Sequence, residues 1–308
     1  MEQSQYVRPM GFGEILDSAV RLFRKNFFAL VIAQLPLTLF YLVNNLISIY
    51  FVGPGGLSFF ETLSTLSQPT VSPEPVDLTF FFVAFLLAII QVALVYPLAL
   101  AAVTKVASDS VLQNRSSVKD AYKFCLRNWF KLGSTNVIIT IALVIIMAIV
   151  LFIPVAVFVA VFAYAYATGP SLGAVAGILL ILLVFMLIAL LVAGFFWARW
   201  VAAFPIMVNE RTFLMEAMSR SWNMVKGKTI RTLFVMVAVF LIPTILQYSS
   251  AFLEFSLGRS LVVLTVVFGI VSQGLLIPLV DCTRVVIYFE LRARKEGFDL
   301  EKRAEQLK

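Results

Sequence analysis

The longest uncharged stretch of the sequence sets the strongest limit on the fold. From Leu132 to Ala198 the chain runs for 67 residues without a single Lys, Arg, Asp or Glu. A helix crosses the hydrocarbon core of a membrane, which is about 30 Å thick, with about 20 residues. The stretch is therefore too long for one span and long enough for two. Residues 168–171 (Thr-Gly-Pro-Ser) favour a turn between the two spans, so we predict a transmembrane helical hairpin here.

Four further apolar runs have the length of membrane spans, namely 27–52, 78–104, 229–252 and 260–290. Together with the hairpin they give six predicted transmembrane helices. Hydrophobic residues make up 61% of the chain and charged residues 13%, a far more apolar composition than that of soluble domains. We therefore expect an all-α, polytopic membrane protein.

The basic residues are unevenly distributed along the chain. Loop 53–77 is rich in Gly, Pro and Ser, contains three acidic residues and has no Lys or Arg. Because Lys and Arg favour the cytoplasmic side of a membrane, we expect this loop to lie outside and both termini to lie in the cytoplasm. We expect the membrane to be the inner cell membrane of a prokaryote. The same placement explains the net charge of +7 without a nucleic-acid partner. All but two of the 24 Lys and Arg lie in four segments: 1–26, 105–131, 209–231 and 284–308.

A short amphipathic segment precedes each predicted pair of spans. The three segments contain Ala19, Ala121 and Ala217 at matching places, 102 and 96 residues apart. At helical spacing each segment has an apolar face and a charged face. The predicted polar face of the first helix consists of Glu14, Asp17, Ser18, Arg21 and Lys25.

These segments suggest an internal repeat. We interpret residues 1–308 as a single membrane domain of three repeated units, over about 1–105, 106–208 and 209–308. Each unit would be an amphipathic helix followed by a helical hairpin. We expect the amphipathic helices to lie on the membrane surface, anchored by bases and aromatic side chains. The residues expected at that surface are Arg21, Lys123, Arg220, Trp129 and Trp222.

Each amphipathic segment also has an acidic residue followed three or four residues later by a base. Such pairs stabilise a helix by about 0.2 to 0.5 kcal/mol each. The predicted pairs are Asp17 with Arg21, Asp120 with Lys123, and Glu216 with Arg220.

Four charged residues within or near the spans are candidates for a site: Lys105, Arg199, Asp281 and Arg284. A charge near the bilayer centre costs about 2.5 to 3.5 kcal/mol or more, so each one needs a partner or a function. If the repeats share an axis, the three bases would converge on one cavity with Asp281 as the counter-charge. Such a cavity would suit a phosphate or an anionic lipid headgroup. In the alternative interpretation these residues form separate structural ion pairs, and Asp281 neutralises Arg284 three residues later.

The sequence has little of what catalysis usually requires. It contains no histidine, the commonest general base and a common metal ligand. The two cysteines, Cys125 and Cys282, are expected to be buried apolar residues rather than a disulfide. No phosphate-binding loop, activated nucleophile or metal-ligand motif is apparent. We expect no enzymatic activity, no cofactor and no metal.

Two segments of the third unit resemble the membrane-domain family of glycerophosphoryl diester phosphodiesterases. The segments are PIMVNERTFLMEAMSRSWNMVKGKTIRTL and IPLVDCTRVVIYFELRARKEGFDLEK, and the opening GFGEILDSAVRLFRKNF is also similar. The resemblance implies an association with lipid or glycerophosphodiester metabolism. The hydrolase fused to this domain in such proteins is a TIM barrel that uses histidines and metal-binding carboxylates, whereas this sequence contains no histidine and no barrel. The matching residues are Glu210, Ala217, Arg220, Ser221, Lys226, Gly227, Tyr288, Leu291, Arg292, Arg294, Glu296, Gly297, Asp299 and Leu300.

Three functions agree with the sequence. The first is a non-enzymatic membrane protein that binds, senses or handles anionic membrane lipids, with Arg199 and Arg284 at the headgroup. The second is a small-molecule permease whose repeat units move around a central site. The third is a scaffold whose helices and C-terminal tail, residues 291–308, bind another membrane or cytoplasmic protein. The sequence does not specify an oligomeric state.

Overall fold

The protein is described here from a computed structural model that covers residues 6–52, 78–114, 117–168, 172–257 and 262–297. The predicted external loop 53–77, most of the predicted turn at 168–171 and the end of the tail fall outside these ranges. All regular structure within them is helical. In chain order the elements are α1 (Phe12–Lys25), α2 (Phe27–Val52), α4 (Leu78–Ile90), η2 (Gln91–Val95), α5 (Tyr96–Val111), α6 (Val118–Arg127), α7 (Trp129–Thr168), α8 (Leu172–Arg199), α9 (Ala203–Glu210), α10 (Leu214–Val225), α11 (Thr229–Leu257), α12 (Val262–Val271), η4 (Ser272–Leu276) and α13 (Ile277–Glu296).

The prediction of six membrane spans is confirmed. Six helical segments are long and apolar enough to cross a membrane, and each coincides with a predicted run. The chain is therefore a multi-pass membrane protein. The six segments are Phe27–Ser48, Thr79–Val111, Trp129–Val157, Leu180–Glu210, Thr229–Ser249 and Val266–Glu296.

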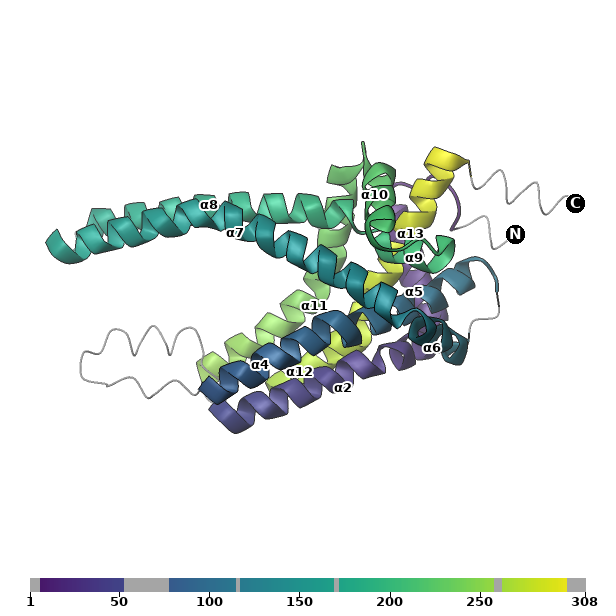
Figure 1. The fold of residues 1–308 in the computed structure, drawn as a ribbon, viewed down its shortest axis with the longest axis horizontal. Helices are drawn as coiled ribbons and strands as arrows, with labels where there is room; N and C mark the ends of the chain where they lie inside the picture. Colours follow the sequence, from purple (N-terminus) through teal and green to yellow (C-terminus); the bar gives the residue numbers. More distant parts are fainter. Residues whose placement is uncertain (1–5, 53–77, 115–116, 169–171, 258–261, 298–308) are drawn as a thin grey trace, which may run out of the picture.

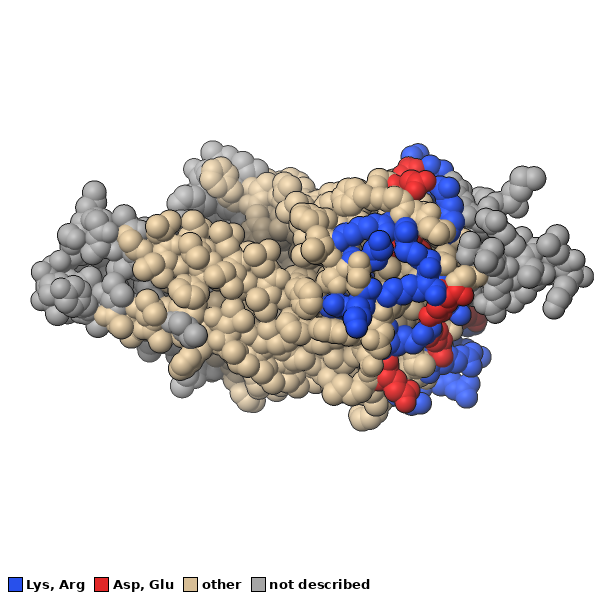
Figure 2. Space-filling model, turned by 90° about the horizontal axis from the view of Figure 1, so that it is seen from above, with Lys and Arg blue, Asp and Glu red and all other residues tan. Residues whose placement is uncertain are grey.

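The spans form two groups that diverge from a common end (Figure 1). One group is the long hairpin of α7 and α8, and the other contains α2, α4 and α12, with α11 running from α8 into it. Helices α1, α6, α9 and α10 lie at the common end together with the last turns of α13. On the face seen in Figure 2, the Lys, Arg, Asp and Glu side chains gather at this end, which we call the charged end.

Helix α13 occupies the centre of the charged end. Every residue from Pro278 to Leu291 is buried, on all sides of the helix. Helices α1, α5 and α11 pack against it, and its buried residues include Asp281, Arg284 and Glu290. A membrane helix that faces neither lipid nor water has to neutralise its charges within the protein. This central position is not evident from the sequence, which marks the segment only as the last span.

Two spans contain a π-helical turn just before a proline. Turn η2 precedes Pro97 in α5, and turn η4 precedes Pro278 in α13. A proline has no N–H and a π turn is wider than an α turn, so carbonyl groups next to it need other donors. Asn136 of α7 donates a hydrogen bond of 2.7 Å to the carbonyl oxygen of Val92 in η2. Helix α7 is thereby attached to the irregular part of the second span.

The central residues of the apolar stripes of α1, α6 and α10 pack against protein. Ala19, Ala121 and Ala217 are all buried in the same hydrophobic core. One residue of the predicted polar face is misassigned, because Ser18 is buried and donates a hydrogen bond to the sulfur of Met10. The stripe therefore attaches each short helix to the bundle, and the charged faces of these helices point outward.

The first two amphipathic helices end in the same way. Asn26 follows α1 with φ −116° and ψ 19°, and Asn128 follows α6 with φ −114° and ψ 16°. Each asparagine side chain donates to the carbonyl four residues earlier, at 2.9 Å in both cases. Helix α10 ends differently, because Lys226, the residue that follows it, has ψ 127°. The threefold repeat remains a prediction, to which this shared cap adds support for two of the units.

Only one of the three predicted acid–base pairs is present. Asp17 accepts a hydrogen bond from Arg21, and this contact raises the pKa of the arginine. Asp120 and Lys123, both among the described residues, form no ion pair with each other. Arg220 does not pair with Glu216 but with two acidic residues from other helices, Glu210 and Glu296. The short-range pairing rule missed these partners because they are distant in sequence.

The contact between α7 and η2 leaves no room for a side chain at Gly133. A Cβ atom there would lie 2.2 Å from the carbonyl oxygen of Ala93. We expect Gly133→Ala to lower the free energy of unfolding by about 1 to 3 kcal/mol, because one of the two helices would have to shift. A thermal melt in detergent, read as a lower Tm, measures the loss.

Gly177→Ala on α8 is the matched control, since nothing lies within 4 Å of the added Cβ atom. It should leave the Tm unchanged or raise it slightly, because alanine favours a helix over glycine by about 1 kcal/mol. Equal melting temperatures for both variants would contradict the close packing of α7 on η2.

Candidate functional site

The predicted site residues occupy three separate places. Lys105 lies on α5 and donates a 2.6 Å hydrogen bond to Asp109 one turn later. Arg199 is the last residue of α8 and contacts α10. Asp281 and Arg284 lie together on α13. The fold therefore brings together Asp281 and Arg284 and gives the other two bases partners of their own.

Arg199 joins the end of α8 to α10. Its guanidinium carbon lies 4.6 Å from the ring centroid of Trp222 and 5.1 Å from that of Phe195. It donates a 3.1 Å hydrogen bond to the carbonyl oxygen of Trp222, while Ser221 donates to the carbonyl of Arg199. A cation beside the last turn of a helix is favoured by the helix dipole, and its position over aromatic faces adds to the attraction. These contacts give Arg199 a structural role, but through aromatic rings and backbone carbonyl groups rather than through the ion pair of the alternative interpretation.

Arg284 and Asp281 form an ion pair inside the membrane-spanning part of α13. The guanidinium Nη1 lies 3.2 Å from the carboxylate, and the two side chains are only 10% and 4% exposed. The same Nη1 donates to the hydroxyl of Tyr96 at 3.4 Å. The Nε–H group of Arg284 is buried and has no hydrogen-bond partner among the described residues. The pair is thus neutral overall, but the arginine keeps an unused donor.

Arg284 lines a cavity of about 310 Å³ at the point where the two groups of spans meet. Of the described residues that line it, Arg284 alone is charged. The other walls combine aromatic and aliphatic side chains with amides and hydroxyls, as small-molecule sites commonly do. The lining residues come from η2, α5, α7, α8, α9, α13 and the turn after α8: Gln91, Val92, Tyr96, Leu100, Asn136, Ile139, Thr140, Leu143, Trp197, Trp200, Val201, Phe204 and Arg284.

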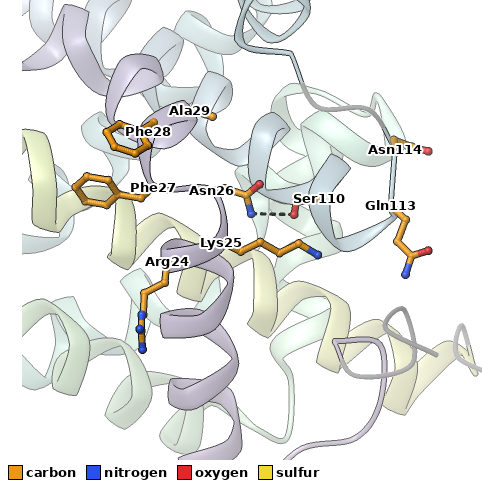
Figure 3. Close-up of a pocket in the computed structure, with 9 residues that line it drawn as sticks. All are labelled: Arg24, Lys25, Asn26, Phe27, Phe28, Ala29, Ser110, Gln113 and Asn114. Atoms are coloured by element: carbon orange, nitrogen blue, oxygen red, sulfur yellow. Dashed lines mark hydrogen bonds between the residues drawn. The ribbon is translucent and has the colours of Figure 1, made fainter.

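A wider hollow lies at the charged end, where α1 ends and α2 begins. Its volume is about 790 Å³ and its lining includes Arg24, Lys25 and Gln113. Figure 3 shows Lys25 extending below Ser110 toward Gln113, while Arg24 points to the other side of α1. Asn26 closes the inner wall by donating a 2.8 Å hydrogen bond to the hydroxyl of Ser110. The hollow faces outward and carries positive charge next to the first residue of a membrane span.

A network of five ionic and phenolic side chains connects α9, α10 and α13 at the charged end. Glu210 accepts hydrogen bonds from Arg220 and from the hydroxyl of Tyr288. Arg220 also donates to Glu296, which accepts a further hydrogen bond from Arg292. Arg220 has a raised pKa, chiefly because Glu210 accepts its hydrogen bond. We call this set the Glu210 network.

Glu290 is the centre of a second network. Its carboxylate is 1% exposed and pairs with Arg231 of α11 at 3.0 Å and with Arg294 of α13 at 2.7 Å. Both arginines also donate to the backbone carbonyl of Met10, just before α1. One buried carboxylate therefore holds the start of the chain, α11 and α13 together. Sequence reasoning singled out neither Glu290 nor Arg231, because these two residues lie 59 residues apart and Arg231 lies 221 residues from Met10.

The residues predicted to lie at the membrane surface differ in environment. Arg21 and Lys123 are exposed on their helices. Trp129 is 49% exposed, but it begins α7 rather than belonging to α6. Trp222 is partly covered by Arg199, and Arg220 belongs to the Glu210 network. The structure thus connects two of these five residues to the protein's own core.

The remaining chemistry of the described residues is sparse. Cys125 and Cys282 are buried free thiols, as predicted. Burial raises the pKa of the Cys125 thiol to about 12. Within the described ranges no three residues of the types His, Cys, Asp and Glu lie together as metal ligands would.

The burial of Cys125 can be tested with a thiol reagent. An exposed cysteine ionises near pH 8.5, so at pH 8 the thiolate fraction of Cys125 is lower by a factor of about a thousand or more. We expect N-ethylmaleimide to label the native protein in detergent at least a thousandfold more slowly than the denatured protein. A Ser117→Cys variant, with the new thiol exposed at the start of α6, is the reactive control. Wild-type labelling as fast as that of the control would contradict the packing of α6.

Residues 172–280 match the model of the membrane domain of glycerophosphoryl diester phosphodiesterase. The match covers α8 to the first turn of α13, about a third of the chain. It confirms the resemblance inferred from the sequence over these residues, including the motif from Glu210 to Gly227. No curated protein and no solved structure matches the chain significantly.

Proposed function

We propose that this protein binds an anionic membrane lipid, with the phosphate at Arg284 and part of an acyl chain in the cavity beside it, and that it catalyses no reaction. The observation that carries the proposal is the buried Arg284 side chain, which lines the cavity with an unpartnered Nε–H group. A guanidinium offers several N–H donors in a plane that matches phosphate oxygens. A buried donor without an acceptor is costly, and a bound phosphate would satisfy it.

The walls of the cavity support an amphiphilic ligand rather than a small ion. Their polar groups include the hydroxyl of Tyr96, which accepts a hydrogen bond from Arg284, and the amide of Asn136, and Ile139, Leu143 and Trp197 provide an apolar surface. Because the helices that form the cavity are membrane spans, a lipid can enter from the bilayer without crossing water. The proposed site contains one base, Arg284, instead of the three bases that the sequence predicted to converge on one cavity.

The hollow at Arg24 and Lys25 supports a second contact with lipid headgroups (Figure 3). The positive-inside tendency would place the charged end in the cytoplasm, where anionic headgroups attract basic side chains by about 1 kcal/mol for each one near the surface. Phe28 next to the hollow is 79% exposed and would lie in the leaflet. Lys123 would contribute to the same surface attraction, whereas the charge of Arg21 is already paired with Asp17.

The family match narrows the class of lipid that we propose as the ligand. The matched family is named after an enzyme that acts on glycerophosphoryl diesters, and the headgroup of a phospholipid is such a diester. We therefore propose a phosphodiester lipid, such as phosphatidylglycerol, as the ligand class of the Arg284 cavity.

The test uses native mass spectrometry of the detergent-purified protein. The variant is Asp281→Asn with Arg284→Gln, which removes the positive charge without leaving an unpaired carboxylate inside the protein. Wild type should keep phosphatidylglycerol bound, and the double variant should bind it at least about tenfold more weakly, since a charge-assisted hydrogen bond contributes about 1.5 to 3 kcal/mol. Arg21→Gln on the exposed face of α1 is the control and should retain the lipid.

Circular dichroism and a thermal melt establish that the double variant is folded. Equal lipid binding by a folded double variant and by wild type would overturn the Arg284 site. Loss of lipid from the Arg21→Gln control as well would indicate unspecific surface attraction and would overturn it equally.

A permease is the second candidate, favoured by a second cavity in the spans. This cavity measures about 300 Å³, lies between α2 and α4, and shares Gln91 with the Arg284 cavity. Its polar residues Asn44, Asn45 and Ser48 would extend a polar route along α2. Transport predicts flux of a soluble phosphodiester into proteoliposomes that falls on Gln91→Leu. Lipid binding without any flux would decide for the first candidate.

A further inference from the structure

We infer that binding of an anion at Arg284 is coupled to the uptake of one proton by Asp281. This inference rests on the proposed function and concerns how the same cavity is regulated. The observations behind it are the burial of both side chains, the 3.2 Å contact between them and the absence of other charged residues from the cavity lining.

The geometry makes the ligand and Asp281 competitors for the same cation. Arg284 Nη1 already forms an ion pair with the carboxylate of Asp281 and donates a hydrogen bond to the hydroxyl of Tyr96. A phosphate in the cavity can accept a hydrogen bond from the Nε–H group of Arg284, which is not used by another of the described residues. A bidentate contact also needs an N–H group from a second nitrogen of the same guanidinium. The carboxylate and the phosphate would then share one positive charge from two sides.

The charge balance decides how this competition is resolved. Before binding, one carboxylate and one guanidinium sum to zero. A monoanionic phosphodiester brings the site to a net charge of −1 in a region from which water is largely excluded, where an uncompensated charge costs several kcal/mol. A proton on Asp281 restores neutrality and releases the guanidinium to the phosphate. The protonated carboxyl can then donate a hydrogen bond instead of accepting one.

Few other groups can take the proton. Arg284 stays positive at any physiological pH. The neighbouring ionisable side chains are Cys282 on α13 and Tyr96 on α5. A thiol and a phenol hydroxyl carry no negative charge, so neither can accept the added proton. The rest of the cavity lining has no Asp, Glu or Lys. Among the described residues that face the pair, Asp281 is therefore the proton acceptor.

The experiment is isothermal titration calorimetry with dihexanoyl phosphatidylglycerol in an uncharged detergent. This lipid keeps a single negative charge between pH 5 and pH 9, so the probe itself does not titrate. Titration in two buffers of different protonation enthalpy counts the protons taken up with the ligand. For wild type we expect one proton per lipid over the pH range in which Asp281 is ionised in the free protein and protonated in the complex. Over that range the Kd should rise about tenfold for each unit of pH.

Asp281→Asn is the decisive variant, because it keeps Arg284 and the shape of the side chain but cannot ionise. It should bind the lipid without proton uptake, with a Kd independent of pH. Glycerophosphoglycerol, which is phosphatidylglycerol without its acyl chains, separates a lipid site from a site for a soluble diester. Binding of the two probes with equal affinity would assign the site to the soluble compound and leave the coupling in force.

The outcomes separate this inference from the function on which it rests. Wild-type binding with no proton uptake, or a Kd equally dependent on pH in wild type and Asp281→Asn, would overturn the coupling and leave the lipid site in place. Failure of both probes to bind wild type at any pH would overturn the proposed function itself. Proton uptake that disappears in Asp281→Asn would support both.

Discussion

The structure depends on neutralising charges that a single buried helix carries. Helix α13 is enclosed by protein from Pro278 to Leu291, so each of its ionised groups needs a counter-charge from the protein itself. Glu290 has two, from Arg231 and Arg294, and these contacts hold α1, α11 and α13 together at the charged end. Asp281 and Arg284 have only each other, and the arginine keeps an unpartnered donor. The ion pairs of Glu290 stabilise the fold, whereas the Asp281–Arg284 pair leaves one N–H donor of Arg284 for a ligand.

The resemblance motif has a structural explanation. Five of its residues, from two segments far apart in the sequence, form the Glu210 network. Gly297 ends α13 in the left-handed conformation with φ 64° and Gly227 follows α10 with φ 87°, where a side chain would be strained. The motif therefore specifies how α10 is attached to α13. The Arg284 cavity is deeper in the spans, and part of its lining lies before residue 172, where the family match begins.

Sequence periodicity was sufficient for the architecture and insufficient for the site. Apolar length located all six spans, and i to i+3 spacing located the Asp281–Arg284 pair. Arg199, Arg220 and Glu290 each have at least one partner from another helix, and one-dimensional spacing cannot show which helices meet. The π turns at η2 and η4 were missed as well, because a proline in an apolar run does not reveal how the preceding turn widens. For the same reason the expected convergence of Lys105, Arg199 and Arg284 rested on a repeat axis that spacing alone could not position.

A structure of the protein in phosphatidylglycerol nanodiscs, determined by cryo-electron microscopy with a rigid antibody fragment, would show whether Arg284 binds a lipid. We expect density for a phosphate within hydrogen-bond distance of the Arg284 guanidinium, about 2.7 to 3.2 Å from a nitrogen atom, continuing into an acyl chain between α5 and α7. An Arg284 side chain bonded only to protein groups, in a cavity with no lipid density at that resolution, would contradict this expectation.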